Sequence, residues 1–356
     1  MRRPLVLGIE TSCDDTACAL LDGDGRVLAS VVSSQLAHGV YGGVVPEIAS
    51  REHLENWPAV VSEALARSGV ALAEVDLVAA TRGPGLVGSL LVGLSLGKAI
   101  AWSLGRPFFA VHHLEGHLYS PFLTAPGSAV PAIPVPENFT ALVVSGGHTS
   151  LFEVASAQIE TLAETRDDAF GEAFDKIGKR VGLPYPQGPH VDRWAELGEA
   201  TRSAIGKPQW ALGLDFSYSG LKSQALLAVE ALERAGVPTQ AADGEPPFEP
   251  PVLDLLAGFR AAAVGQLIDK LARLARTRAI EVLAVSGGAA ANRLLRRRLT
   301  EWCAEHEVDL RLVPLVYSGD NAAMIAHAAL LAHRRGQVAH DFAADAVSRI
   351  PLGGTS

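Results

Sequence analysis

Cysteine is scarce in this chain: Cys13, Cys18 and Cys303 are the three among 356 residues. No two of them form a C-x-x-C pair and their number is odd, which argues against a disulfide framework and against a cysteine zinc site. A secretory segment is also missing, because the apolar run near the N-terminus is short and ends at Glu10. These absences predict a cytoplasmic protein.

Positive charge is in short supply. The chain has 30 Lys and Arg residues against 39 Asp and Glu residues, which gives a formal net charge of −9. This charge argues against a protein whose whole surface binds nucleic acid. Local basic clusters remain, and each also fits a solvated helix face. They are Arg273, Arg276 and Arg278, then Arg293, Arg296, Arg297 and Arg298, and finally Arg334 and Arg335.

One apolar run, residues 86–104, is nearly long enough to cross a bilayer. Lys98 lies well inside it, and a charge there is costly in lipid. Gly93 and Gly97 allow close approach of neighbouring elements. The run therefore predicts a buried helix, and no membrane partner.

The chain is long enough for two domains, and its 48% hydrophobic residues can build a sizeable core. Strands predicted at 5–10 and 17–21 flank a polar turn, and the same strand–turn–strand pattern returns at 140–145 and 150–154. This repetition predicts a duplicated architecture. The predicted division is a first α/β lobe at 1–138 with the C-terminal helix 321–356 packing back on it, and a second, more helical α/β lobe at 139–320 with a loop insertion at 237–251.

The tetrapeptide Val-Ser-Gly-Gly occurs twice, at Val144–Gly147 and Val285–Gly288, each time after a predicted buried strand. A strand that feeds a glycine-rich turn is a common place to bind phosphate. The first copy continues as a strand and the second continues as a helix. Together they predict a clamped nucleotide, and the plan is similar to the actin, sugar-kinase and heat-shock-chaperone ATPase superfamily: an α/β, two-lobed fold with a duplicated mixed-sheet core and an interdomain nucleotide cleft.

A candidate metal site begins with His113 and His117, which lie four residues apart and so share one face of a helix. Glu115 would lie about 200° round that helix from His113, so the site lacks the general base of a zinc protease. Asp320, where a turn enters a helix, is either a third ligand or an N-cap. Two histidines and one carboxylate suit iron(II) or zinc.

Several motifs in this chain, together with the His113/His117 pair, resemble motifs of the bacterial TsaD family and occur in the same order. Members of that family are tRNA N6-adenosine threonylcarbamoyltransferases. The resemblance spans nearly the whole chain. The motifs are Gly8–Thr16, Arg82–Leu86, Val144–Thr149, Gly171–Lys176, Phe216–Lys222, Ser286–Asn292 and Asp320–Ile325.

The resemblance implies transfer of a threonylcarbamoyl group from threonylcarbamoyl-AMP to N6 of the adenosine adjacent to the anticodon, in tRNAs that read ANN codons. It places the metal ligands at His113, His117 and Asp320, with one divalent ion, Fe(2+) or alternatively Zn(2+). It also implies TsaB-like and TsaE-like protein partners.

The resemblance further implies substrate-binding residues, with Asp175 accepting hydrogen bonds from a ribose and Asn292 orienting the nucleotide. A base would activate the attacking amine, and Glu10 or Asp14 in the first turn could transfer the proton. The chain departs from the family pattern at Asp15, Gln187 and Gly319, and Gln187 is expected to line the turn at Gly188. The substrate-binding set is Val143, Val144, Ser145, Gly146, Gly147, Asp175, Gly188, Asp192 and Asn292.

Two other functions fit part of the sequence. An ATP-dependent small-molecule kinase would explain the glycine turns but would leave the histidine pair and Asp320 unused. A non-enzymatic nucleotide-binding scaffold would fit the acidic surface, and it predicts nucleotide binding without turnover.

Overall fold

The structure, a computed structural model, divides into two compact units that are discontinuous in sequence. Unit 1 comprises Met1–Pro136 and Val313–Ser356, and unit 2 comprises Glu137–Leu312. The chain thus returns to unit 1 at Val313, before the predicted return at residue 321. The described residues are 4–35, 38, 43–125, 128, 133–205, 213–241, 248–337, 339 and 342–352.

Unit 1 is built on a five-stranded mixed sheet in the order β3-β2-β1-β4-β5. Strands β1 (Val6–Glu10), β2 (Asp15–Leu21) and β3 (Val27–Ser34) form an antiparallel meander. Strands β4 (Leu77–Gly83) and β5 (Phe108–His112) continue the sheet in parallel with β1. Every residue of β1 is buried, as expected for a strand at the centre of a covered sheet.

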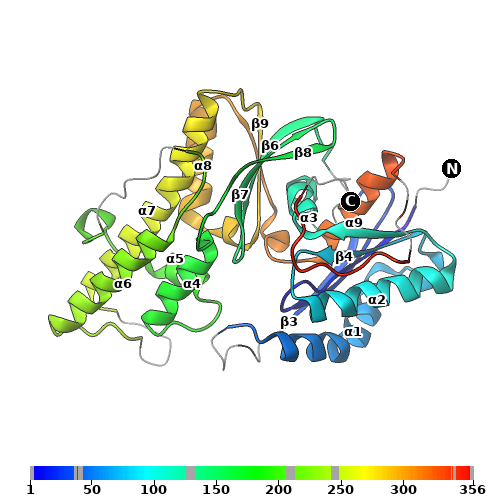
Figure 1. The fold of residues 1–356 in the computed structure, drawn as a ribbon, viewed down its shortest axis with the longest axis horizontal. Helices are drawn as coiled ribbons and strands as arrows, with labels where there is room; N and C mark the ends of the chain where they lie inside the picture. Colours follow the sequence, from blue (N-terminus) through cyan, green and yellow to red (C-terminus); the bar gives the residue numbers. More distant parts are fainter. Residues whose placement is uncertain are drawn as a thin grey trace. The chain divides into compact units, whose positions relative to one another are not determined.

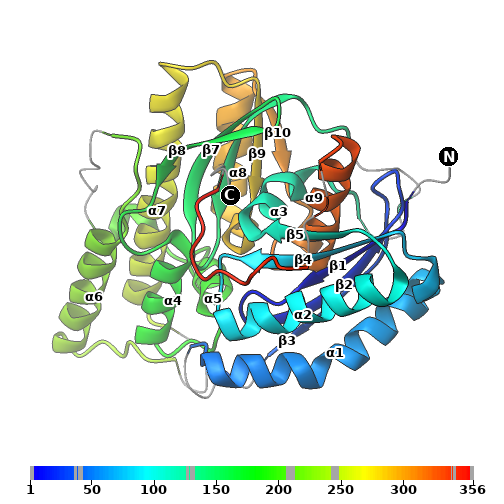
Figure 2. The same cartoon turned by 45° about the vertical axis from the view of Figure 1, so that its right-hand side comes forward.

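Helices cover both faces of the unit 1 sheet (Figures 1 and 2). Leu7 and Ile9 face a core shared with α1 (Pro46–Ser68) and α2 (Val87–Leu104). Gly8, between them, points to the opposite face and contacts α9 (Ala322–Arg334). The short helix α3 (His113–Tyr119) follows β5 directly and packs against α9.

Among the described residues, α2 and the unit 2 helix α7 (Pro250–Ala275) are long and apolar enough to cross a membrane by length and composition. In α2 the predicted close packing is confirmed: a Cβ at Gly93 would lie 2.3 Å from Thr11 Oγ1, and one at Gly97 would lie 2.9 Å from the Phe108 ring. The Lys98 ammonium donates to the Ala344 carbonyl. Packing against the sheet explains the inner face of this helix. Only 33% of α2 is buried, and Val87, Leu91 and Trp102 are exposed, so the prediction of a buried helix is wrong for its outer face.

Unit 2 repeats the sheet of unit 1, with the order β10-β9-β6-β7-β8. Strands β6 (Asn138–Val144), β7 (Thr149–Ala155) and β8 (Gln158–Glu164) form the antiparallel meander. Strands β9 (Val282–Ser286) and β10 (Asp309–Leu312) are parallel to β6. Because each unit opens with a meander whose first strand then pairs with a later parallel strand, the predicted duplicated mixed-sheet core is confirmed.

The helices of unit 2 account for its more helical character (Figure 1). In helix α7 (Pro250–Ala275), 61% of the most apolar 18-residue stretch is buried. The helix contacts α5 (Gln187–Trp194), α6 (Ser219–Arg234) and α8 (Arg293–Glu305). Helix α4 (Phe170–Arg180) packs against α5 and α6. Both units also contain short 3₁₀ helices, at Leu72–Glu74, Ser120–Phe122, Ala200–Arg202, Gly288–Ala291 and Leu315–Tyr317.

Some elements differ from the sequence predictions. The helix predicted for 321–356 ends at Arg334, where the Gly336 N–H bonds back to the His333 carbonyl, and residues 342–352 contain no helix. Strand β8 and helix α5 are not predicted, because β8 is a largely polar edge strand and α5 is short. Within the predicted loop insertion at 237–251, residues 242–247 lie outside the described part of the chain.

Candidate functional site

His113, His117 and Asp320 come together in unit 1. Their ligand atoms all lie within 4.8 Å of one another. Asp320 Oδ1 lies 3.5 Å from His113 Nε2 and 3.3 Å from His117 Nε2. Two atoms bound to one ion at about 2.1 Å with tetrahedral angles lie about 3.4 Å apart, so the two separations between Asp320 and the histidines suit a shared metal ion.

The local sequence explains how these side chains meet. Helix α3 begins at His113, so His113 and His117 are one turn apart and both are buried. Asp320 lies in the turn before α9, and the N-cap of α9 is Asn321, whose side chain accepts the Met324 N–H at 3.0 Å. Asp320 is therefore not the helix cap, which was its alternative role.

His117 provides the test of whether a metal fits. Its ring is fully buried, Nδ1 has no hydrogen-bond partner within the described residues, and Nε2 has only the Asp320 carboxylate, 3.3 Å away. An orphaned buried nitrogen is costly unless something binds it. Burial lowers the pKa of His117, which keeps the imidazole in the neutral form that ligates metals. The donor set and the orphaned ring nitrogen fit a divalent cation.

The buried Glu10 side chain contacts the ring of His113. The Glu10 side chain is completely buried, and Oε2 lies 3.1 Å from His113 Nδ1. Ser12 N–H and the Thr81 hydroxyl each donate to the Glu10 carboxylate at 2.5 Å. With Nδ1 committed to Glu10, His113 presents Nε2 to Asp320. Sequence analysis did not identify Ser12 and Thr81, although Ser12 lies within the Gly8–Thr16 motif.

The His113–Glu10 contact is ionic in the absence of a metal. Burial alone would lower the pKa of His113, but the carboxylates of Asp320 and Glu10 outweigh it and raise the pKa to about 9. Burial alone would raise the pKa of Glu10, but His113 holds it below its ordinary value. Whether the ring is neutral or protonated, Nδ1 carries a proton and donates a hydrogen bond to Glu10.

Glu115 and His112 lie beside the histidine pair but do not join it. Burial raises the pKa of Glu115 to about 7, and the charge that opposes this shift is Arg335. Glu115 thus faces away from the metal ligands, as the helical spacing predicts. His112 accepts the Leu114 N–H at its Nδ1, 3.1 Å away, and thereby caps α3, while burial lowers the pKa of His112 to about 4.

In unit 2 the two Val-Ser-Gly-Gly segments end at the same edge of the sheet. Strands β6 and β9 are parallel, with Val143 opposite Ser286. Gly287 has φ +94°, and a Cβ there would lie 2.3 Å from the Val144 carbonyl oxygen, so only glycine fits between the turns. A Cβ added at Gly146 or Gly147 would meet nothing within 4 Å. The first turn therefore leaves room for a ligand.

The other predicted substrate-binding residues of unit 2 bond mainly to the protein itself. Asp175 Oδ1 accepts the Gly188 N–H at 2.7 Å, and Asn292 caps α8 by accepting the Leu295 N–H at 3.0 Å. Asp192 receives the Arg293 N–H at Oδ2, 3.1 Å away. These bonds connect α4, α5 and the start of α8.

Asp192 also pairs with a buried cation that sequence analysis missed. Arg260 of α7 lies 3.0 Å from Asp192 Oδ1, donates to the Asp192 and Ala195 carbonyls, and contacts Glu196. The Arg260 side chain is 6% exposed. Both carboxylate oxygens of Asp192 are therefore engaged, so this residue braces the helices of unit 2.

Gln187 is 4% exposed. A Cβ at Gly178 of α4 would lie 2.5 Å from Gln187 Cβ, so the first side-chain carbon of Gln187 fills the notch left by that glycine. The expectation that this side chain lines the turn at Gly188 is wrong, because α4 and α5 bury it between them.

Several arginines of the basic clusters bond to other groups of the protein although they are exposed. Arg278 pairs with Glu153 and Glu160, Arg334 donates to the Gly23 carbonyl, and Arg335 donates to the Tyr119 hydroxyl at 3.1 Å. Several arginines of α8 are exposed, namely Arg293, Arg297 and Arg298.

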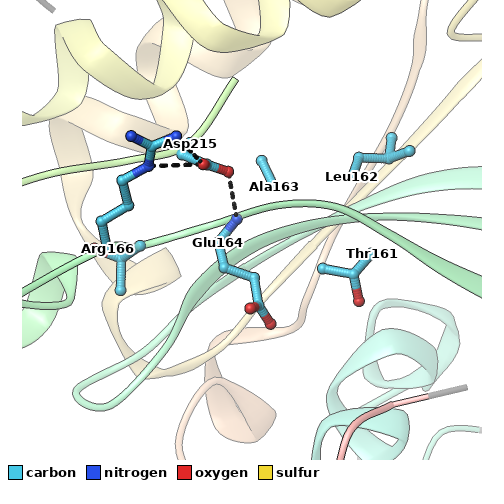
Figure 3. A pocket seen from close by; sticks show the side chains of 7 residues that line it. Thr161, Leu162, Ala163, Glu164, Arg166 and Asp215 are labelled. Carbon is cyan, nitrogen blue, oxygen red and sulfur yellow. Dashed lines mark hydrogen bonds and ion pairs between the residues drawn. The ribbon is translucent and has the colours of Figure 1, made fainter. Parts of the chain in front are cut away.

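A separate hollow of about 260 Å³ lies at the edge strand β8 in unit 2 (Figure 3). Asp215 there bonds to Arg166 Nε at 2.8 Å and accepts the Glu164 N–H at 3.4 Å. The lining contains none of the predicted site residues: it is formed by Thr161, Leu162, Ala163, Glu164, Thr165, Arg166 and Asp215.

Comparison with known sequences gives one consistent family. The model of the TsaD family, described as tRNA N6-adenosine threonylcarbamoyltransferase, matches residues 26–327. A protein of that name from Pelobacter propionicus is 48% identical over 325 residues, covering 90% of each chain. Another from Thermus thermophilus is 44% identical over 338 residues, covering 94% of each chain.

Solved structures share the fold at low sequence identity. HypF from T. kodakarensis matches with a TM-score of 0.60 and 14% identity, over 94% of this chain and 48% of its own. Component A of (R)-2-hydroxyglutaryl-CoA dehydratase from Acidaminococcus fermentans matches with a TM-score of 0.50 and 16% identity, over 93% and 98% of the two chains. These likenesses support the two-lobed fold class alone.

Proposed function

The chain belongs to the TsaD family of tRNA N6-adenosine threonylcarbamoyltransferases and is a transferase of that class, and from this we propose its reaction in detail. The threonylcarbamoyl group of threonylcarbamoyl-AMP is transferred to N6 of the adenosine adjacent to the anticodon in tRNAs that read ANN codons. AMP is the leaving group. The observation that carries the proposal is the cluster of two buried histidines, His113 and His117, with the partly buried Asp320 in a chain of this family.

We propose that His113, His117 and Asp320 hold one divalent ion, Fe(2+) with Zn(2+) as the alternative. A bound ion supplies Lewis-acid stabilisation of negative charge on substrate oxygens. Glu10 orients His113: it accepts a hydrogen bond from the Nδ1–H and holds the ring with Nε2 toward Asp320. Because Glu10 is fully buried, we assign it a positioning role in place of proton transfer from the substrate.

The attacking N6 amine is a weak nucleophile, so a base near it assists the transfer. Asp14 lies in the turn between β1 and β2 and is only partly buried, and we propose it as that base.

The donor nucleotide is proposed to bind at Val143–Gly147, with its phosphate at the open Gly146–Gly147 turn. The hydrogen bonds that connect α4, α5 and the start of α8 shape this region. They are made by Asp175, Gly188, Asp192 and Asn292. Their contribution is to fix the backbone around the nucleotide, because Asp175, Asp192 and Asn292 each accept a protein N–H at a side-chain oxygen, and Gly188 donates the N–H that Asp175 accepts.

We further propose that the enzyme works in the cytoplasm with TsaB-like and TsaE-like partners. The net charge of −9 leaves this chain with limited basic surface for tRNA. Partner proteins that share the contact with tRNA would compensate for that limitation.

The test combines the purified chain, both partners, threonylcarbamoyl-AMP and unmodified tRNA, and detects threonylcarbamoyladenosine by nucleoside mass spectrometry. His117→Ala should abolish both the product and the bound metal, whereas His333→Ala, at an exposed position on α9, should retain both. Absence of product with folded, metal-loaded protein would overturn the proposed reaction. Full product from His117→Ala without bound metal would overturn the metal-assisted mechanism alone.

A further inference from the structure

A segment near the C-terminus lies along unit 1 and reaches the start of α3. Phe342 stacks on Phe108 with ring centroids 6.3 Å apart and meets Trp102 edge to face at 5.2 Å. Further on, the Val347 N–H donates to the Arg82 carbonyl at 2.8 Å, and Gly85 N–H donates to the Ser348 carbonyl at 3.3 Å. Residues 342–350, which we call the C-terminal strap, are thus anchored at several points (Figure 2).

The strap ends its contacts on His112. The His112 Nε2–H donates to the Ile350 carbonyl at 3.1 Å, across 238 residues of sequence. The strap also contacts the neighbouring strand, because a Cβ at Gly83 would lie 2.0 Å from the Val347 carbonyl oxygen, and Gly83 is paired with His112 between β4 and β5. Only glycine allows the strap to lie this close.

His112 is therefore held from two sides. Its Nε2–H is committed to the strap, which leaves Nδ1 as the acceptor for the Leu114 N–H at the start of α3. The next residue, His113, is a proposed metal ligand, and His117 lies one turn further along α3. A rotation of this seven-residue helix would move both imidazoles relative to Asp320.

We propose that His112 is a positioning residue for the metal centre and that the C-terminal strap fixes it. The strap orients His112, His112 orients the first turn of α3, and that turn sets His113 and His117 for metal binding. The match to the family model ends at residue 327, before the strap begins. The inference rests on the metal site in the proposed function.

The test measures metal affinity of the full-length protein with Zn²⁺ by chelator competition, and the site geometry with the absorption spectrum of bound Co²⁺. His112→Ala removes both bonds and should weaken Zn²⁺ binding about 10-fold or more, as loss of an outer-shell partner does. His112→Asn keeps a capping oxygen but cannot reach the strap, so its loss should be smaller. Val347→Pro removes the N–H that anchors the strap, and Val347→Ala is its matched control.

We expect Val347→Pro to weaken Zn²⁺ binding and shift the Co²⁺ spectrum, Val347→Ala to do neither, and the His112→Ala/Val347→Pro double variant to lose little more than His112→Ala alone. Unchanged affinity in folded His112→Ala, with a lower melting temperature only, would show a purely structural role and overturn the proposal. Wild-type affinity in Val347→Pro would remove the strap from it. If the wild-type protein binds neither ion, the metal site itself is wrong and the positioning role falls with it.

Discussion

Asp192→Asn tests whether Asp192 braces unit 2 or contacts substrate directly. The wild-type carboxylate serves two donors at once, the Arg260 guanidinium at 3.0 Å and the Arg293 N–H at 3.1 Å. Asparagine has one side-chain oxygen, so one buried donor loses its acceptor, and the charge that balances Arg260 is lost. Breaking a buried ion pair by removing one partner costs about 3–5 kcal/mol.

The surroundings of Arg260 reduce that cost. Glu196 also contacts the guanidinium, and the Asp192 and Ala195 carbonyls accept from it, so the cation keeps part of its neutralisation. We therefore expect Asp192→Asn to lower the free energy of unfolding by about 2–3 kcal/mol, below the range for an isolated buried pair. The assay is urea unfolding followed by circular dichroism at neutral pH.

The matched control is Asp254→Asn, which makes the same chemical change where the carboxylate accepts the Glu199 N–H at 2.6 Å. It should cost less than about 1 kcal/mol, because that site is partly open to water. AMP binding, measured by calorimetry on the folded variants, gives the second readout. If Asp192→Asn keeps wild-type stability but loses AMP binding, Asp192 is a ligand contact and our reasoning about a brace is refuted.

Three further predictions follow from other sites. Glu10→Gln should raise the dissociation constant for Zn²⁺ by about 10-fold or more because His113 loses its charged partner, and an unchanged constant would remove Glu10 from the metal site. Since the pKa of Glu115 is raised to about 7 in the folded protein, the folded state binds the extra proton, and the free energy of unfolding should fall as pH rises from about 4.5 to 7. Urea unfolding at pH 5 and 8 should show a fall of at most about 3 kcal/mol in the wild-type protein, and Glu115→Gln should abolish that fall. Parallel pH profiles of the wild-type protein and the variant would contradict this. Gly287→Ala should destabilise the protein by about 3 kcal/mol or more and weaken AMP binding, while Gly288→Ala, whose Cβ meets nothing within 4 Å, should do neither; equal effects would refute the close-approach argument.

The features predicted from sequence are those with strong local patterns. Strands β1 (Val6–Glu10) and β2 (Asp15–Leu21) lie within two residues of the predicted bounds, because consecutive buried residues give a clear apolar run. The spacing of His113 and His117 predicts a shared helix face, and the structure brings Asp320, the predicted third ligand, close to both histidines. Local periodicity carries this information within a few residues.

The features that were missed depend on contacts between distant residues. The Arg260–Asp192 pair spans 68 positions and the Glu10–His113 contact spans 103. Nothing near Glu10 in the sequence distinguishes a carboxylate that orients a histidine from one that transfers a proton. Strand β8 was missed because an edge strand can be polar on both faces, so it lacks the alternation that marks buried strands.

The discontinuity of unit 1 sets an order of events during synthesis. The ribosome makes His113 and His117 well before Asp320, and all of unit 2 is produced in between. Until α9 emerges, the sheet face at Gly8 lacks the helix that covers it, since Ala322 and Ala326 are the residues in contact there. A nascent chain halted before Val313 therefore holds two histidines without their carboxylate. Tight binding of the ion would mark the moment when the last helix has docked onto the first strand.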